Sequence, residues 1–111
     1  MNVKQKELVL LPYPFSNMEG MKVRPALVIS NDIFNLKSDD CLMVPLTSII
    51  KNEPYSVLIE QQDLRAGKLI KSSRARLDKI FTVEKKLIIK KIGILNDKTF
   101  DEIKKEILKV F

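Results

Sequence analysis

Two arginines and an aspartate at alternate positions form a group that could act on a phosphate. Arg74, Arg76 and Asp78 fall on one face if their segment is extended, because side chains alternate across a strand. Ala75 and Leu77 then face the core. Alternate strand residues lie about 6.6–7 Å apart, which matches the phosphate repeat of an RNA strand. We expect this face either to hold successive phosphates beside an ionised carboxylate or to form a solvent-exposed ladder of salt bridges.

Arg24 stands near the start of an otherwise apolar segment, VRPALVI at 23–29. Charges are rarely buried unpaired, so an arginine here is unusual. Pro25 keeps Arg24 extended and indicates the first residues of a strand. A guanidinium held in this way suits bidentate contact with a phosphate. The alternative is that Arg24 only begins the strand, with its charged group in water.

Two hydroxyl groups, Thr47 and Ser48, directly follow the apolar run 42–46. Hydroxyl side chains at the end of a strand often cap a turn. They can also donate a hydrogen bond to a phosphate oxygen. Both interpretations stay open on these residues alone.

The composition removes several kinds of chemistry. The chain has no histidine, which excludes histidine acid–base catalysis, histidine-bound metals and the common hydrolytic triads. Cys41 is the single cysteine, which excludes a disulfide within the chain and a cysteine-cluster zinc site and favours a reduced, cytoplasmic setting. The adjacent carboxylates Asp39 and Asp40 point to opposite faces of a strand. We expect neither a metal nor a cofactor.

The positive charge of the chain is concentrated in one stretch. Residues 65–91 hold ten basic and two acidic residues, a net +8, which leaves −2 for the rest of a chain whose total is +6. Such a stretch is typical of a protein that binds a polyanion. It is also compatible with an ordinary lysine-rich surface.

The pattern of apolar runs predicts a small, mainly β fold in one domain, 1–111. Short runs separated by turn residues are typical of a barrel or sandwich; they lie at 8–11, 23–29, 41–46, 55–59, 75–83 and 87–95. The polar segment 16–22 predicts an exposed loop between the first two strands. No apolar run is long enough for a membrane span, and the N-terminal residues do not resemble a secretion signal.

The C-terminal segment changes to a helical period. Apolar residues recur there at steps of three and four: Phe100, Ile103, Ile107 and Val110 or Phe111. Asn96 is the preferred N-cap, with a capping box of Thr99 and Glu102 as the alternative. The predicted architecture is a β-barrel closed by one helix.

These segments, in this order and spacing, resemble the MazF/PemK family. The matching stretches are LVLLPYPFSN (8–17), VRPALVISND (23–32), CLMVPLTS (41–48), RLDKIFTV (76–83) and KIGILND (91–97). RPALVIS followed by VPLTS is the most specific part. Lys6–Glu7 departs from the Gly-Asp that opens many members, and the short segment 16–22 does not allow a cleavage motif to be transferred.

The resemblance implies an SH3-like barrel, a homodimer, and a cytoplasmic toxin that cleaves single-stranded RNA without metal until an acidic antitoxin covers its active site. It implies Arg24 and Thr47 as the catalytic pair. The Arg-x-Asp of the PemK branch falls on Arg76 and Asp78. We expect these and three further residues to bind RNA or support the site: Lys22, Ser48 and Arg74.

The implied reaction is attack by the 2′-hydroxyl of the RNA on the adjacent phosphorus, which leaves a 2′,3′-cyclic phosphate and a 5′-hydroxyl. Arg24 would stabilise the charge on phosphorus and Thr47 would hold a non-bridging oxygen. The general base stays open, because arginine is effectively never deprotonated, and Asp78 is the easier candidate. Two alternatives are a CcdB-like inhibitor of DNA gyrase without nuclease activity and a non-catalytic RNA-binding module.

Overall fold

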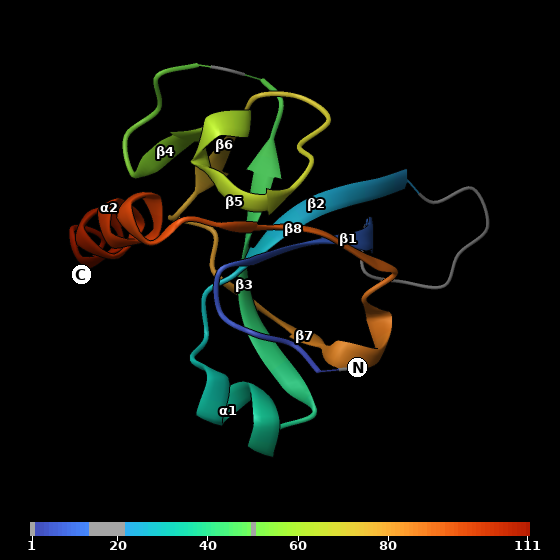
Figure 1. Cartoon of the computed structure of the whole chain (residues 1–111). Coiled ribbons are helices and arrows are strands. Elements are labelled where there is room, and N and C mark those ends of the chain that lie inside the picture. The colour runs from blue at the N-terminus through green and yellow to red at the C-terminus, as the bar shows by residue number, and fades with distance from the viewer. Residues whose placement is uncertain (1, 14–21, 50) are drawn as a thin grey trace.

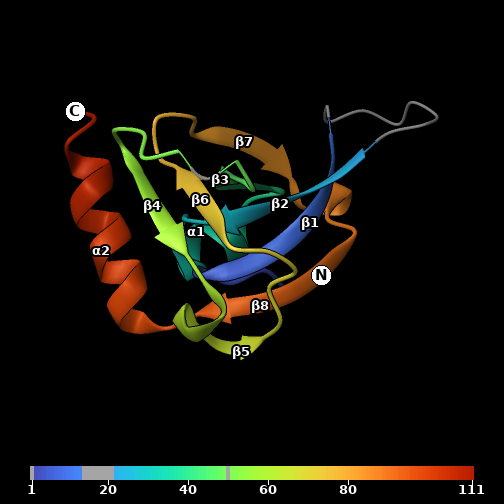
Figure 2. The ribbon, with the colours of Figure 1, turned by 90° about the horizontal axis from the view of Figure 1, so that it is seen from above.

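A curled antiparallel sheet organises the part of the chain that the computed structural model describes, residues 2–13, 22–49 and 51–111 (Figures 1 and 2). Its strands run in the order β4, β6, β3, β2, β1, β8 and β5, and β7 pairs with the first half of β3. The strands are β1 (Glu7–Tyr13), β2 (Lys22–Val28), β3 (Asp40–Thr47), β4 (Ser56–Ile59), β5 (Leu64–Gly67), β6 (Ser73–Arg76), β7 (Phe81–Glu84) and β8 (Lys90–Leu95). The predicted mainly β fold with a C-terminal helix is confirmed.

The central strands bury both of their faces, which explains why the sequence shows continuous apolar runs there. Along β2, Leu27 enters one core while Ala26 and Val28 enter a second core on the other face. The first core is covered by helix α2 (Asp97–Leu108), whose Phe100 is buried in it. The second core lies against β7 and the N-terminal segment. Strands covered on both sides lose the simple apolar–polar alternation of an exposed sheet.

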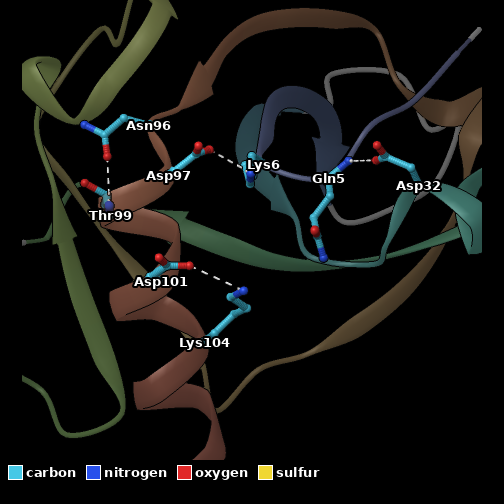
Figure 3. A network of polar contacts seen from close by, with 8 residues as sticks. All are labelled: Gln5, Lys6, Asp32, Asn96, Asp97, Thr99, Asp101 and Lys104. Atoms are coloured by element: carbon cyan, nitrogen blue, oxygen red, sulfur yellow. Dashed lines mark hydrogen bonds and ion pairs between the residues drawn. The ribbon is translucent and has the colours of Figure 1, made fainter.

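Helix α2 begins where the sequence predicts. The Asn96 side chain accepts a hydrogen bond from the backbone N–H of Thr99 at 2.8 Å, which satisfies one of the unpaired donors of the first turn (Figure 3). Phe100 and Ile103 are buried, and the helix lies beside β4 (Figure 2). The apolar stripe of the helix is shorter than predicted, because α2 ends at Leu108 and Val110 and Phe111 lie beyond it.

The start of β1 is tied to both helices. Lys6 adopts a positive φ of 79°, and its ammonium lies 2.8 Å from an oxygen of Asp97 at the start of α2 (Figure 3). The backbone N–H of Gln5 donates to Asp32 at the start of α1 (Asp32–Lys37) at 2.8 Å (Figure 3). These contacts fix the first strand against the elements that cover the sheet.

The apolar run 75–83 is divided between two strands. Strand β6 ends at Arg76, a turn follows, and β7 begins at Phe81. The two short strands pair with different halves of β3, since Leu46 lies opposite Ala75 and Met43 opposite Phe81. The turn between Arg76 and Phe81 therefore separates two strands that pair with the same edge of β3.

Other differences concern short elements. The sequence predicted one helix, but the six-residue α1 also forms, capped by Asn31, whose side chain accepts from the N–H of Phe34 at 2.8 Å. Strand β5 was not predicted, and the run 87–95 becomes a strand only from Lys90. The predicted loop at 16–22 lies outside the described residues except for Lys22, which opens β2. No helix in the described ranges is long and apolar enough to cross a membrane.

Candidate active site

Two prolines mark the place where β2 and β3 stop pairing. The β2–β3 ladder joins residues 26–28 to residues 43–45, and its last pair is Ala26 with Pro45. Pro25 lies just beyond this pair, so β2 is an edge on that side, where a missing N–H is tolerated. Past Pro45, strand β3 pairs only on its other edge, where β6 follows β7 as its partner. The strand ends are thus not joined by a continuous ladder, and a cleft lies between them.

Arg24 and Thr47 both line this cleft, which has a volume of about 500 Å³. They fall on the same face of the sheet as Ala26 and Pro45, because each lies two positions beyond that pair. Arg76 lines the same cleft from β6. The structure therefore brings together three of the residues that the sequence pointed to. The remaining lining residues are Pro45, Leu46, Ile49, Lys79, Ile80 and Phe81.

The Thr47 side chain is fixed by the turn that follows it. Its Oγ1 accepts a hydrogen bond from the backbone N–H of Ile49 at 3.2 Å. A hydroxyl has one hydrogen and two acceptor lone pairs, so this contact leaves the hydrogen able to donate. Capping the turn and donating to a phosphate oxygen, the two interpretations left open by the sequence, are therefore compatible.

Arg76 and Asp78 form a two-point ion pair at the edge of the cleft. Arg76 Nε lies 3.2 Å from Asp78 Oδ1, and Arg76 Nη2 lies 3.0 Å from Asp78 Oδ2. The hydrogen bond from Arg76 holds the pKa of the Asp78 carboxyl below its usual value, with a further contribution from the charge of Lys79. The sequence predicted Asp78 on the same strand face as Arg76, but it lies in the turn after β6. Its side chain folds back onto Arg76.

Arg74 lies on the same face as Thr47 but leans toward another strand. The two residues are direct partners across β3 and β6. Arg74 Nε donates to Ser56 Oγ of β4 at 2.9 Å, and β4 lies on the side of β6 away from β3. Arg74 does not line the cleft. The expected spacing of two arginines along one face is present, but their side chains point in different directions.

A second cleft lies on the opposite face of the same strand ends. It has a volume of about 300 Å³ and is mostly apolar, and Arg24 borders it as well as the first. Ser48 lines this second cleft, since it alternates with Thr47. Lys22 is exposed at the beginning of β2 and lines neither cleft.

The basic stretch 65–91 is divided among β5, β6, β7 and β8. It runs through β5 at one end of the strand order, through β6 near the other end, and through β8. Within it, Lys85 donates to the backbone oxygen of Asn35 at 2.7 Å, and Lys91 pairs with Glu7 at 3.1 Å. Of the lysines in this stretch, Lys79 lines the cleft of Arg24 and Thr47. In the sequence, Lys79 stands out only as part of the total charge, although it directly follows the Arg-x-Asp motif.

The described residues offer no group suited to a metal ion. Within residues 2–13, 22–49 and 51–111, no cluster of three or more His, Cys, Asp or Glu side chains could hold one. Cys41 is buried, and burial raises the pKa of its thiol, which makes it a weak nucleophile. The polar side chains that line the cleft are the guanidinium groups of Arg24 and Arg76, the ammonium of Lys79 and the hydroxyl of Thr47.

Comparison with known proteins gives a family and a fold. Residues 4–111 match the sequence model of a family described as PemK-like, MazF-like toxin of type II toxin–antitoxin system. No match is found among curated proteins.

Several solved structures share the fold at low sequence identity. An endoribonuclease from a mycobacterial species superposes with a TM-score of 0.80 at 17% identity, over 99% of this chain and 91% of that one. MazF in a MazE–MazF complex from Deinococcus radiodurans gives 0.80 at 18%, over 99% and 96%. The Mycobacterium tuberculosis toxin MazF-mt6 gives 0.76 at 16%, over 95% of each chain.

Proposed function

Because the chain belongs to the family of PemK-like and MazF-like toxins of type II toxin–antitoxin systems, we propose that it is an endoribonuclease that cleaves single-stranded RNA without a metal ion. The observation that carries this proposal is the cleft between β2 and β3, where Arg24 and Thr47 occupy matching positions on one face. Structures of similar fold carry the name endoribonuclease, which supports the same activity.

The reaction uses a nucleophile that the RNA itself provides. The 2′-hydroxyl oxygen forms a bond to the adjacent phosphorus, and the bond from phosphorus to the 5′-oxygen breaks. One proton leaves the 2′-hydroxyl and one reaches the 5′-oxygen, so the products are a 2′,3′-cyclic phosphate and a 5′-hydroxyl. DNA lacks this hydroxyl and is not cleaved.

Arg24 and Thr47 act on the charge that develops on phosphorus. A guanidinium placed before the reaction stabilises the phosphorane oxygens, a contribution of about 3–4 kcal/mol for one well-placed donor. Thr47 donates its hydroxyl hydrogen to a non-bridging oxygen, while the Ile49 N–H keeps its oxygen in place. The two groups enter from different strands and so can contact the same phosphate from two sides.

Asp78 supports Arg76 in this proposal and does not remove the proton. A carboxylate whose pKa is lowered by its arginine partner is a weaker base than a free one. Its two oxygens are also occupied by the guanidinium. Asp78 therefore orients Arg76 toward the cleft.

The proposal includes partners and a location. Similar folds are found in complex with a cognate antitoxin and with MazE. We propose an acidic antitoxin for this chain, a homodimer as the active form, and action in the cytoplasm, where RNA is available.

The experiment that tests this function uses a long single-stranded RNA in excess EDTA. Cleavage that requires Arg24 and Thr47 supports the endoribonuclease. Binding without cleavage would indicate an RNA-binding module, and inhibition of DNA gyrase without either would indicate a CcdB-like toxin. Strict dependence on added magnesium would contradict the metal-independent mechanism.

A further inference from the structure

The cleft contains three cations, and their charges are not balanced in the same way. Arg24, Arg76 and Lys79 line it, and no acidic residue among the described ones does. Arg76 is held by Asp78 through two contacts at 3.0 and 3.2 Å. The pair carries no net charge, so at a distance it attracts a polyanion weakly.

Lys79 differs from Arg76 in this respect. In the described part of the chain, its ammonium takes part in no ion pair, and the residue is exposed. The turn fixes its backbone, since the Lys79 N–H donates to the Arg76 carbonyl oxygen at 3.2 Å. This contact places Lys79 directly after the ion pair and beside the same cleft.

We propose that Lys79 binds an RNA phosphate next to the one that is cleaved, and that it, rather than the Arg76–Asp78 pair, supplies the sequence-independent attraction of this side of the cleft. The proposal rests on the endoribonuclease function and extends it to substrate binding. A lysine suits this task, because its ammonium is a point charge on a flexible stem and can follow phosphates of differing position. Arg76, fixed by Asp78, instead offers oriented donors at short range.

The test measures how binding depends on salt. The probe is a random-sequence single-stranded oligodeoxynucleotide, which keeps the phosphates but lacks the 2′-hydroxyl and is not cleaved. Affinity is measured at three sodium chloride concentrations for the wild type and for Lys79→Gln. Lys90→Gln is the matched control: this exposed lysine belongs to the same basic stretch but lies on β8, separated from β3 by β1 and β2. A third variant combines Arg76→Gln with Asp78→Asn.

Loss of one phosphate contact flattens the plot of log affinity against log salt by about 0.7 on single strands. We expect this change for Lys79→Gln, with about a threefold loss of affinity at moderate salt that is similar for different base sequences. Lys90→Gln keeps the wild-type slope. The double variant removes a neutral pair and changes the slope less than Lys79→Gln does. With cleavable RNA, Lys79→Gln raises KM rather than lowering kcat, since its contact is the same before and during the reaction.

Two results would overturn the inference. If Lys79→Gln keeps the wild-type slope and affinity, Lys79 is not part of the binding site. The proposal that Arg24 and Thr47 cleave RNA would be unaffected by that result. A double variant that flattens the slope as much as Lys79→Gln would show that the ion pair is not neutral toward RNA. Failure of the wild-type protein to bind or cleave any nucleic acid would instead reject the proposed function itself, and this inference with it.

Discussion

Arg24 and Thr47 each lie two residues beyond Ala26 and Pro45, the last paired residues of β2 and β3, and both line the cleft that lies there. The ladder up to that pair packs into both cores, because Ala26 and Met43 lie in the second core while Leu27 and Val44 lie in the first. This mostly buried ladder therefore sets the positions of an exposed arginine and a half-buried threonine. Such placement matters, because catalysis by preorganised groups depends on geometry that does not have to be formed during the reaction.

Replacing Arg24 tests its proposed role directly. We expect Arg24→Ala to keep the fold, since the side chain is exposed, and to lower RNA cleavage by about two to three orders of magnitude through loss of one charge donor. Circular dichroism checks the fold, and Arg65→Ala, an exposed arginine on β5, is the control for charge. A folded Arg24→Ala protein that cleaves at the wild-type rate would remove Arg24 from the site.

Thr47 provides a second, independent test. Thr47→Val keeps the shape of the side chain but removes the hydroxyl, so we expect cleavage to fall by about two orders of magnitude. Thr47→Ser keeps the hydroxyl and should retain most of the activity. Equal activity of the valine and serine variants would show that the hydroxyl takes no part.

The ion pair of Asp78 predicts a pH dependence of stability. Its folded-state pKa lies below the unfolded value of about 3.9, so the ionised carboxyl stabilises the fold at neutral pH. The contribution is lost as the pH falls below about 4 and through the lowered folded-state pKa. Because the pair is partly exposed, we expect less than about 1 kcal/mol. Urea unfolding of wild type and Asp78→Asn should differ at pH 7 and converge near pH 2; a constant difference would contradict this.

The cap of α2 predicts a local effect on stability. Asn96→Ala removes the acceptor for the Thr99 N–H and should lower the free energy of unfolding by about 1 kcal/mol. Lys98→Ala, at an exposed position in the same turn, should change it much less. Thermal unfolding of both variants gives the comparison, and equal melting temperatures would rule out the cap as a source of stability.

The sequence predicted best those features that local chemistry determines. Asn96 was the expected cap because its side chain satisfies the first turn of the helix directly. Arg24 and Thr47 were singled out as polar residues beside apolar runs, and the resemblance to a family paired them. Their common cleft depends on the register of β2 with β3, which no local pattern contains.

Features that depend on partners distant in the sequence were not predictable in the same way. The spacing of Arg76 and Asp78 is the same whether Asp78 belongs to the strand or to a turn after it. Asp78 lies in a turn because β3 changes its partner from β7 to β6 at this point. Helix α1 is too short for a periodic pattern, and its one local signal is the cap, Asn31 before Asp32. The basic stretch is continuous in the sequence, but the sequence does not show that its strands take different places in the strand order.

The most direct test of the account is the chemistry of the cleaved ends. Purified protein is incubated in excess EDTA with a long single-stranded RNA and with DNA of the same sequence, and the products are analysed by mass. We predict RNA fragments that end in a 2′,3′-cyclic phosphate and begin with a 5′-hydroxyl, intact DNA, and at least about a hundredfold fewer fragments from Arg24→Ala at matched times. Fragments with 5′-phosphate and 3′-hydroxyl ends, or cleavage of the DNA, would contradict attack by the 2′-hydroxyl in the cleft of Arg24 and Thr47.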